Sequence, residues 1–365
     1  MENMEKNNKD VKTKNIDNTE KKHNEQNKKD KETKEYKWQN LNYFNKLKVK
    51  NYVVTFISII ALYIVLSFTF DPNDAFSYTK GIYINILIFV LFAVSLNITV
   101  GLMGQLNLGQ AGFIAIGGYS AAFISKILVN YNLPPFLQLI LVSLFGGLVA
   151  AVFGFFVGGS TLRLRGDYLA IVTLAFGEII KSVINYLDIT GGSKGLSKIP
   201  VYSDYNNFTV VFIIMVICIV LISNLINSRD GRAIKSIRDN DIAAESIGIK
   251  ISKYKVSAFV IAAGFAGLAG ALYAHNVGII KPNIFDYNKS IEILVFVVLG
   301  GMGNIPGSII SAIILTVLPE FLRGADNLRM LLYAIVLILM MIFNNSKFKD
   351  SLSMNKTFRK LRRED

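Results

Sequence analysis

The chain has 365 residues, of which 52% are hydrophobic and only 18% charged, with a formal net charge of +13. Soluble domains average about 25% charged residues, and the charges here gather near the two ends and in one internal stretch. The apolar runs between them are near the length of about 20 residues that crosses a bilayer as a helix. This pattern predicts an all-α polytopic membrane protein and excludes a large soluble domain. One cysteine, Cys218, and two histidines exclude an internal disulfide and disfavour a thiol or histidine-rich metal site.

Residues 1–50 are rich in lysine, asparagine and glutamate and hold almost no aliphatic side chains. Such a segment cannot bury a core, so we expect a disordered cytoplasmic tail. It is too long for the basic region of a secretory signal, and no small-residue cleavage site follows the first apolar run. Its lysines can contact anionic membrane lipid, but a solvated tail that fixes orientation is the simpler interpretation.

Residues 51–345 form the predicted transmembrane permease domain, and 346–365 a basic cytoplasmic C-terminal tail. We expect about ten transmembrane helices, with the eighth segment short enough to be re-entrant or broken. The segments are Val53–Phe70, Ile82–Val100, Ala111–Val129, Phe136–Val157, Tyr168–Leu187, Phe208–Leu225, Val256–Val277, Ser290–Leu299, Ser308–Leu322 and Leu328–Phe343.

The distribution of cations supports an even number of crossings. If the N-terminal tail is cytoplasmic, the loops after even-numbered segments are cytoplasmic too, and these loops are the basic ones. The opposite loops, such as 71–80 and 188–207, carry few cations for their length. The positive-inside rule therefore predicts a multi-pass protein of a bacterial-type cytoplasmic (inner) membrane, with both termini cytoplasmic. The basic charge is explained by orientation, and no nucleic-acid partner is expected.

Two glycine-rich stretches, 99–112 and 298–307, interrupt the apolar pattern. They share a Gly-x-Met-Gly-amide motif at Gly101–Gln105 and Gly300–Asn304, which indicates an internal repeat. Paired glycine-interrupted segments in transporters mark the permeation path. Close helix packing through small residues is the alternative.

The fifth segment places Glu178, Lys181 and Asn185 on one helical stripe. A carboxylate at the bilayer centre costs about 2.5–3.5 kcal/mol, so it normally faces a cavity or a partner. Glu178 is thus either a residue of the path or a member of an ion pair with Lys181. The candidate translocation-path residues are Asn97, Gln105, Asn107, Gln110, Thr173 and Glu178.

The polar stretch 229–254, within a cytoplasmic loop at 228–255, carries signals of two short helices. Arg232–Arg238 has Ile234 and Ile237 on one face. Asp239 and Asp241 are N-cap residue types, Ile242–Ile247 is a short helix-forming run, and Gly248 is suited to the position that closes a helix. Such a compact, slightly apolar knob suits a groove on a soluble partner. A solvated loop between two spans is the alternative.

Catalytic motifs are missing from the sequence. Gly191–Ser197 lacks the Gly-Lys-[Ser/Thr] end of a phosphate-binding loop, and neither His-Glu-x-x-His nor Gly-x-Ser-x-Gly occurs. We therefore expect a non-enzyme that has neither an energy source nor a cofactor of its own.

Several long motifs, in order, resemble the M-type inner-membrane permease of branched-chain amino acid ABC importers, the Liv family. The resemblance runs from about Tyr83 to Phe343. The motifs are Leu162–Ile180, Thr190–Gly195, Ser228–Ala233, Ile237–Gly248, Ala262–Ala274 and Val298–Gly303.

This resemblance implies a heteromeric importer of leucine, isoleucine and valine, or of related solutes. Its other members are an H-type permease, two cytoplasmic ATPase subunits that use the ATP, and an extracytoplasmic solute-binding protein. It also implies that the loop with Ala243, Ala244, Glu245 and Gly248 is the coupling helix that docks on an ATPase. We expect Arg232, Arg238, Asp239 and Glu245 to make rim contacts. The shape of the knob then comes from Ile242, Ala243, Ala244, Ile247 and Gly248.

Three other functions remain open to test. A secondary transporter driven by an ion gradient would use Glu178 and Glu292 as ion sites. A channel would have no need of the short helix at 241–248. A membrane-embedded enzyme lacks any catalytic set in this sequence.

Overall fold

The computed structural model describes residues 77–322 except 132, 162–165 and 204–206, together with 334, 335 and 338. Every described residue belongs to the compact unit Leu66–Asp365. Both predicted tails and the first segment, Val53–Phe70, lie outside the described residues. So does nearly all of the last segment, Leu328–Phe343. These expectations therefore stay predictions.

The described part is built of helices, and its only β-type pairing is an isolated bridge between Leu196 and Ile280. The helices are α2 (Ser77–Asn97), the π-helix η1 (Ile98–Leu102), α3 (Gln110–Leu128), η2 (Val129–Tyr131), α4 (Pro135–Thr161), α5 (Asp167–Tyr186), η3 (Asp188–Thr190), η4 (Gly192–Lys194), α6 (Phe208–Asn227), α7 (Arg229–Asp239), α8 (Asp241–Ser246), α9 (Ile251–Val277), η6 (Pro282–Phe285), α10 (Tyr287–Gly300) and α11 (Ile305–Phe321).

Five of these helical stretches are long and apolar enough to cross a membrane: Gly81–Leu102, Gln110–Tyr131, Pro135–Thr161, Phe208–Asn227 and Ile251–Val277. The fifth predicted segment is also a helix, α5, but it carries charged side chains. The eighth and ninth are the shorter helices α10 and α11, of 14 and 17 residues. The all-α class is confirmed for the described part of the chain, and the total of ten crossings stays a prediction.

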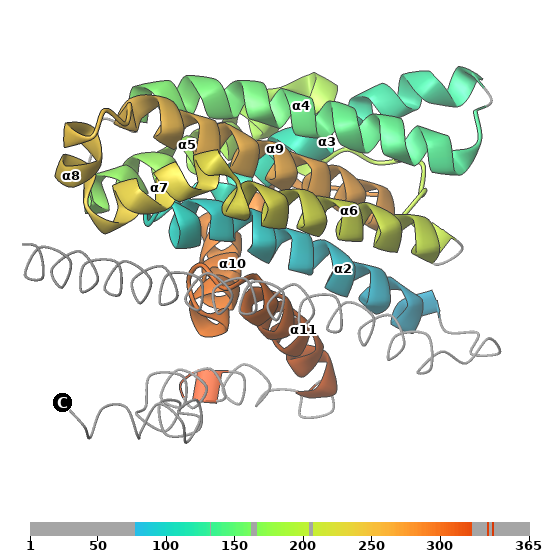
Figure 1. Cartoon of the computed structure of the whole chain (residues 1–365). Coiled ribbons are helices and arrows are strands. Elements are labelled where there is room, and N and C mark those ends of the chain that lie inside the picture. Colours follow the sequence, from blue (N-terminus) through green and yellow to red (C-terminus); the bar gives the residue numbers. More distant parts are fainter. Residues whose placement is uncertain are drawn as a thin grey trace, which may run out of the picture. The chain divides into compact units, whose positions relative to one another are not determined.

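Helix α2 lies at the centre of the bundle. Its sequence is apolar on every side, as is typical of a helix surrounded by others, and its membrane-length stretch is almost entirely buried. It contacts α6, α9, α10 and α11 (Figure 1).

Small residues let α3, α4 and α9 approach each other closely. A Cβ built on Gly117 of α3 would lie 2.1 Å from the Gly267 carbonyl oxygen of α9, and one on Gly267 would lie 2.2 Å from the Cβ of Ala150 in α4. Only glycine fits at such distances, and close packing of this kind is common between membrane helices. We call this contact the glycine seam (Gly117, Ala150 and Gly267).

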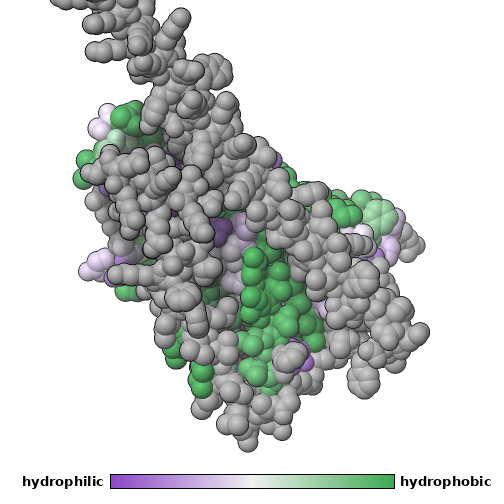
Figure 2. Space-filling model, turned by 60° about the horizontal axis from the view of Figure 1, so that its bottom comes forward, coloured by the Kyte–Doolittle hydropathy of each residue, from purple (hydrophilic) through white to green (hydrophobic). Residues whose placement is uncertain are grey.

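Helices α4 and α6 are far less covered than α2, since only a third of the membrane-length stretch of each is buried. Their exposed side chains, such as Leu144, Phe155, Ile217 and Leu221, are apolar. An apolar groove of about 830 Å³ runs between α4, α6 and α9. On the face that Figure 2 presents, hydrophobic residues also form a continuous band. Surfaces of this composition suit lipid.

Candidate functional site

Helices α7 and α8 lie together at one end of the bundle (Figure 1). Helix α7 begins after Ser228, whose hydroxyl accepts a hydrogen bond from the Gly231 N–H (3.1 Å). Ile234 and Ile237 are both buried, which confirms that they share an inward face. The polar stretch is therefore anchored to the bundle by an apolar face.

Helix α8 has a defined cap at each end. The side chain of Asn240 accepts a hydrogen bond from the Ala243 N–H (3.0 Å), so the N-cap is Asn240. The N-cap predicted at Asp241 is wrong, because Asp241 already lies in the first turn, and Asp239 is the last residue of α7. At the other end, the N–H groups of Gly248 and Ile249 donate to the carbonyls of Glu245 and Ala244. This is a Schellman motif, and Gly248 has the left-handed φ of +87° that the motif requires.

An exposed apolar surface lies on α8 and the cap that follows it. Ile242 and Ile247 are 73% and 75% exposed, and Ala243, Glu245 and Gly248 are exposed as well. Ala244 is the exception, because it is buried against the protein's own body. The knob available to a partner thus comprises Ile242, Ala243, Ile247 and Gly248, with Glu245 beside them.

The two arginines expected at the rim of the knob behave differently. The Arg232 guanidinium donates to the backbone carbonyl of Asn227 (3.0 Å) at an exposed position. The Arg238 guanidinium instead spans two places: Nη1 donates to the Gly101 carbonyl (2.9 Å), while Nε and Nη2 donate to one oxygen of Asp239. Arg238 therefore joins α7 to the first glycine-rich interruption.

The two interruptions lie against each other. A Cβ on Gly101 would lie 2.2 Å from the Gly303 nitrogen. Asn97, which is buried, accepts a hydrogen bond from the Gly303 N–H (2.8 Å) and donates to the Ser308 hydroxyl (2.9 Å). The two repeats of the Gly-x-Met-Gly-amide motif thus form one cluster. We call Gly101–Gln105 the first glycine motif and Gly300–Asn304 the second.

Three other residues predicted for the path meet where α3 begins. Asn107 caps this turn by accepting from the Gly109 N–H (2.9 Å), and its amide lies 3.4 Å from Gln110 Oε1. The Thr173 hydroxyl of α5 accepts from the Leu108 N–H (3.1 Å). These side chains hold the irregular backbone in place through hydrogen bonds. Gln105, in contrast, keeps a buried Oε1 atom without a hydrogen bond.

Sequence reasoning missed the serines and asparagines that complete these contacts. The Ser95 hydroxyl accepts from the Gln110 amide, and the Ser290 hydroxyl accepts from the Ala111 N–H. Asn276 of α9 donates to Asn85 of α2. In the sequence, these residues are visible only as small polar residues within apolar runs. This signal is weak, because a serine hydroxyl can also donate to a backbone carbonyl of its own helix.

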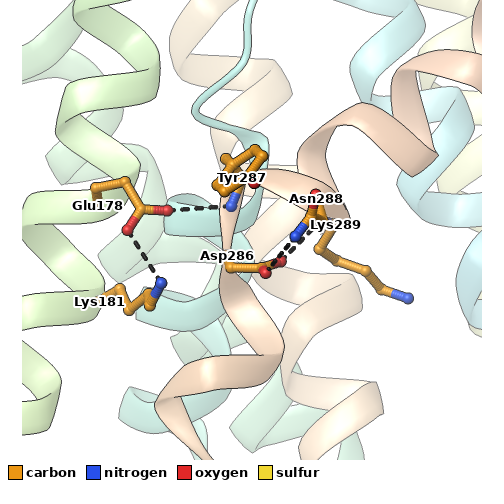
Figure 3. A network of polar contacts seen from close by, with 6 residues as sticks. All are labelled: Glu178, Lys181, Asp286, Tyr287, Asn288 and Lys289. Carbon is orange, nitrogen blue, oxygen red and sulfur yellow. Dashed lines mark hydrogen bonds and ion pairs between the residues drawn. The ribbon is translucent and has the colours of Figure 1, made fainter.

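Glu178 forms an ion pair and caps a second helix (Figure 3). One carboxylate oxygen lies 3.0 Å from the Lys181 ammonium group, and the other accepts from the Tyr287 N–H at the start of α10 (3.1 Å). Asp286 is the N-cap of α10 and accepts from the Lys289 N–H, while the Lys289 side chain points away from Glu178. Helices α5 and α10 are therefore joined by a helix-capping carboxylate.

The side chains that an ion-driven transporter or an enzyme would use make contacts within the chain. Glu292 lies 2.9 Å from the ammonium group of Lys289, so both carboxylates of the ion-driven alternative are paired with lysine. His275 donates through Nδ1 to the Ala271 carbonyl and stacks on Tyr202. Among the described residues, no group of three or more His, Cys, Asp or Glu side chains is arranged to hold a metal ion.

Comparison with known proteins agrees with this geometry. A family model described as "Branched-chain amino acid transport system / permease component" matches residues 78–343. The chain is 36% identical over 289 residues to the high-affinity branched-chain amino acid transport system permease protein LivM of Salmonella typhimurium and to that of Escherichia coli K12. Each alignment covers 70% of this chain but only 66% of the relative.

Identity to the high-affinity branched-chain amino acid transport system permease protein LivH of Salmonella typhimurium is lower, 24% over 246 residues, which cover 63% of this chain and 80% of that protein. The family match and the apolar helices indicate an integral membrane protein, and the higher identity favours the M type. The chain belongs to the permease family of branched-chain amino acid transport systems and within it is of the LivM type.

Proposed function

We propose that this chain is the membrane subunit of an ATP-driven ABC importer that carries branched-chain or related amino acids inward. It would act beside an H-type permease, two cytoplasmic ATPases and a solute-binding protein outside the membrane. The observation that carries this proposal is the exposed apolar surface of α8 on an anchored base. An ATPase that docks on Ile242, Ala243, Ile247 and Gly248 could move α7 and α8 as one body.

The surface of α5 supports a position for the second permease. The exposed faces of α4 and α6 are apolar along most of their length, whereas the last turns of α5 expose Ser182 and Asn185, among Ile179, Val183 and Tyr186, beside the Glu178–Lys181 pair. Polar and charged side chains at membrane depth normally face protein or water. We therefore assign this face of α5 to the contact with the partner permease, and the solute path to the space beside it.

Replacing both exposed isoleucines of the knob tests the docking surface. We expect Ile242→Asp/Ile247→Asp to insert and fold normally, because neither side chain is buried. A carboxylate in an apolar groove should lower the amount of ATPase that co-purifies from membranes by about tenfold or more. Uptake of labelled leucine should fall in parallel.

The control is Ile189→Asp, which places one aspartate at a 70%-exposed isoleucine in η3. This variant should retain the ATPase. Undiminished ATPase in the α8 variant would reject the docking surface. The importer class itself is tested in vesicles, because uphill uptake by this chain alone would contradict it.

A further inference from the structure

The guanidinium group of Arg238 links the end of α7 to the first glycine motif. The Arg238 Cα belongs to the last turn of α7, and Nε and Nη2 donate to Asp239 at 3.1 and 3.0 Å. Nη1 reaches the Gly101 carbonyl, 137 residues away in sequence, at 2.9 Å. A hydrogen bond from a charged donor is roughly twice as strong as a neutral one, so this contact resists separation of α7 from the first glycine motif.

The glycine motifs leave space for this arginine. A Cβ on Gly104 would lie 2.4 Å from Arg238 Cγ, and one on Gly303 would lie 3.5 Å from Arg238 Nη1. Gly104 also has a φ of +71°, which suits glycine. A cavity of about 320 Å³ adjoins the guanidinium, lined by Val100, Gly101, Gly104, Leu106, Arg238 and Met302.

A displacement at Gly101 cannot stay local. Gly101 packs on the backbone of Gly303, and Asn97 bonds both Gly303 and Ser308. Ser308 belongs to α11, and Asn97 ends α2. The central helix and both glycine motifs therefore form one bonded cluster, which meets α7 at Arg238.

We propose that Arg238 is a strut through which movement of α7 and α8 repositions both glycine motifs and the cavity between them. In this role Arg238 positions the motifs through its bond to the Gly101 carbonyl. This inference rests on the proposed function, because an ATPase is the source of the movement.

Amide hydrogen exchange on the purified full-length chain tests the contact without any transport assay. Loss of the strut in Arg238→Ala should speed exchange of the Met103, Gln105 and Gly303 amides by about tenfold, the effect of losing one charged hydrogen bond. Arg238→Lys keeps the charge but lacks the planar fork that bonds Gly101 and Asp239 at once, so it should give an intermediate value. Arg229→Ala removes an exposed guanidinium from the first turn of the same helix and should change nothing. Unaltered exchange in Arg238→Ala overturns the strut.

A second variant displaces the arginine without removing it. Gly104→Ala puts a methyl group into the space of the Arg238 stem, and it should loosen the same amides. Gly192→Ala is the control for backbone strain, since Gly192 also has a positive φ (+55°) but its Cβ would meet nothing closer than 3.4 Å. A Gly104→Ala protein whose amides exchange as in wild type counts against the strut.

Uptake by the complete importer then tests the role of the strut. Arg238→Ala should retain co-purifying ATPase and ATP hydrolysis, yet lower the initial uptake rate by about tenfold. The α8 variant Ile242→Asp/Ile247→Asp should instead lose the ATPase itself. Full uptake by Arg238→Ala overturns transmission through Arg238 and leaves the importer assignment intact. If wild-type protein captures no ATPase, the importer assignment fails, and the exchange experiment still decides whether Arg238 holds the motifs.

Discussion

Polar side chains within the apolar runs accept hydrogen bonds from backbone N–H groups in loops and at helix starts. Asn97 satisfies the Gly303 N–H, Thr173 satisfies that of Leu108, and Glu178 satisfies that of Tyr287. In lipid an unpaired N–H costs several kcal/mol, so non-helical backbone persists only where such acceptors exist. These residues were predicted for the path. Their observed contacts are structural, and a place beside the path stays a prediction.

Variants of Glu178 can separate a structural role from a role in the passage of solute. Glu178→Gln keeps an oxygen for the Tyr287 N–H but loses the charge pair with Lys181, which is partly exposed and worth about 0.2–1 kcal/mol. Assembly and uptake should therefore stay close to wild type. Glu178→Ala also removes the acceptor at the start of α10 and should lose about 1 kcal/mol more.

Thermal unfolding in detergent and leucine uptake measure the two effects of these variants. A glutamine variant with unchanged stability but no uptake would assign the carboxylate to passage and contradict its structural role.

At the scale of helices, the sequence predicted the existence of the long helices in the described part of the chain, but their ends and caps less well. The predicted third segment began at Ala111 and α3 begins at Gln110, whereas α9 begins at Ile251, five residues before the predicted Val256, because its first turns are polar. Gly248 was predicted at the end of α8 and is confirmed. The N-cap was placed at Asp241 although Asn240 fills it, since both are good caps and only backbone geometry distinguishes them.

The cap of α8 should control how well the knob is presented. Asn240→Ala removes the acceptor for the Ala243 N–H and should cost about 1 kcal/mol, which is large for a helix of six residues. Exchange of the Ala243 and Ala244 amides should accelerate and ATPase capture should fall, while the global unfolding temperature stays unchanged.

Asn240→Asp should restore the cap, because an aspartate side chain also accepts from the Ala243 N–H. Asn227→Ala, at an exposed asparagine before α7, is the control. Equal ATPase capture by all three variants would show that α8 need not be pre-formed.

At the scale of the whole molecule, the long-range contacts are what the sequence could not supply. The resemblance of the two glycine motifs was visible, but their mutual contact joins residues about two hundred positions apart. The contact of Arg238 with the Gly101 carbonyl was also hidden, because it joins residues 137 positions apart. Whether glycines pack or line a path was left open. Beyond the first of these stretches, Gly117 of α3 packs against α9 in the glycine seam.

The glycine seam should set the stability of the bundle. In Gly267→Ala the new methyl group would lie 2.2 Å from Ala150 Cβ and 2.8 Å from the Gly146 carbonyl oxygen. These atoms belong to a packed helix that cannot shift locally, so overpacking should cost about 1–3 kcal/mol.

Gly264→Ala, one turn earlier on α9, is the control, because its new methyl group would meet its nearest atoms at 3.4 and 3.5 Å. The stability of the Gly264→Ala variant should equal or exceed that of wild type, because alanine favours the helix by up to about 1 kcal/mol over glycine. Thermal unfolding of the two purified variants measures the difference, and equal unfolding temperatures would mean that α3, α4 and α9 are not held at the separation that the seam requires.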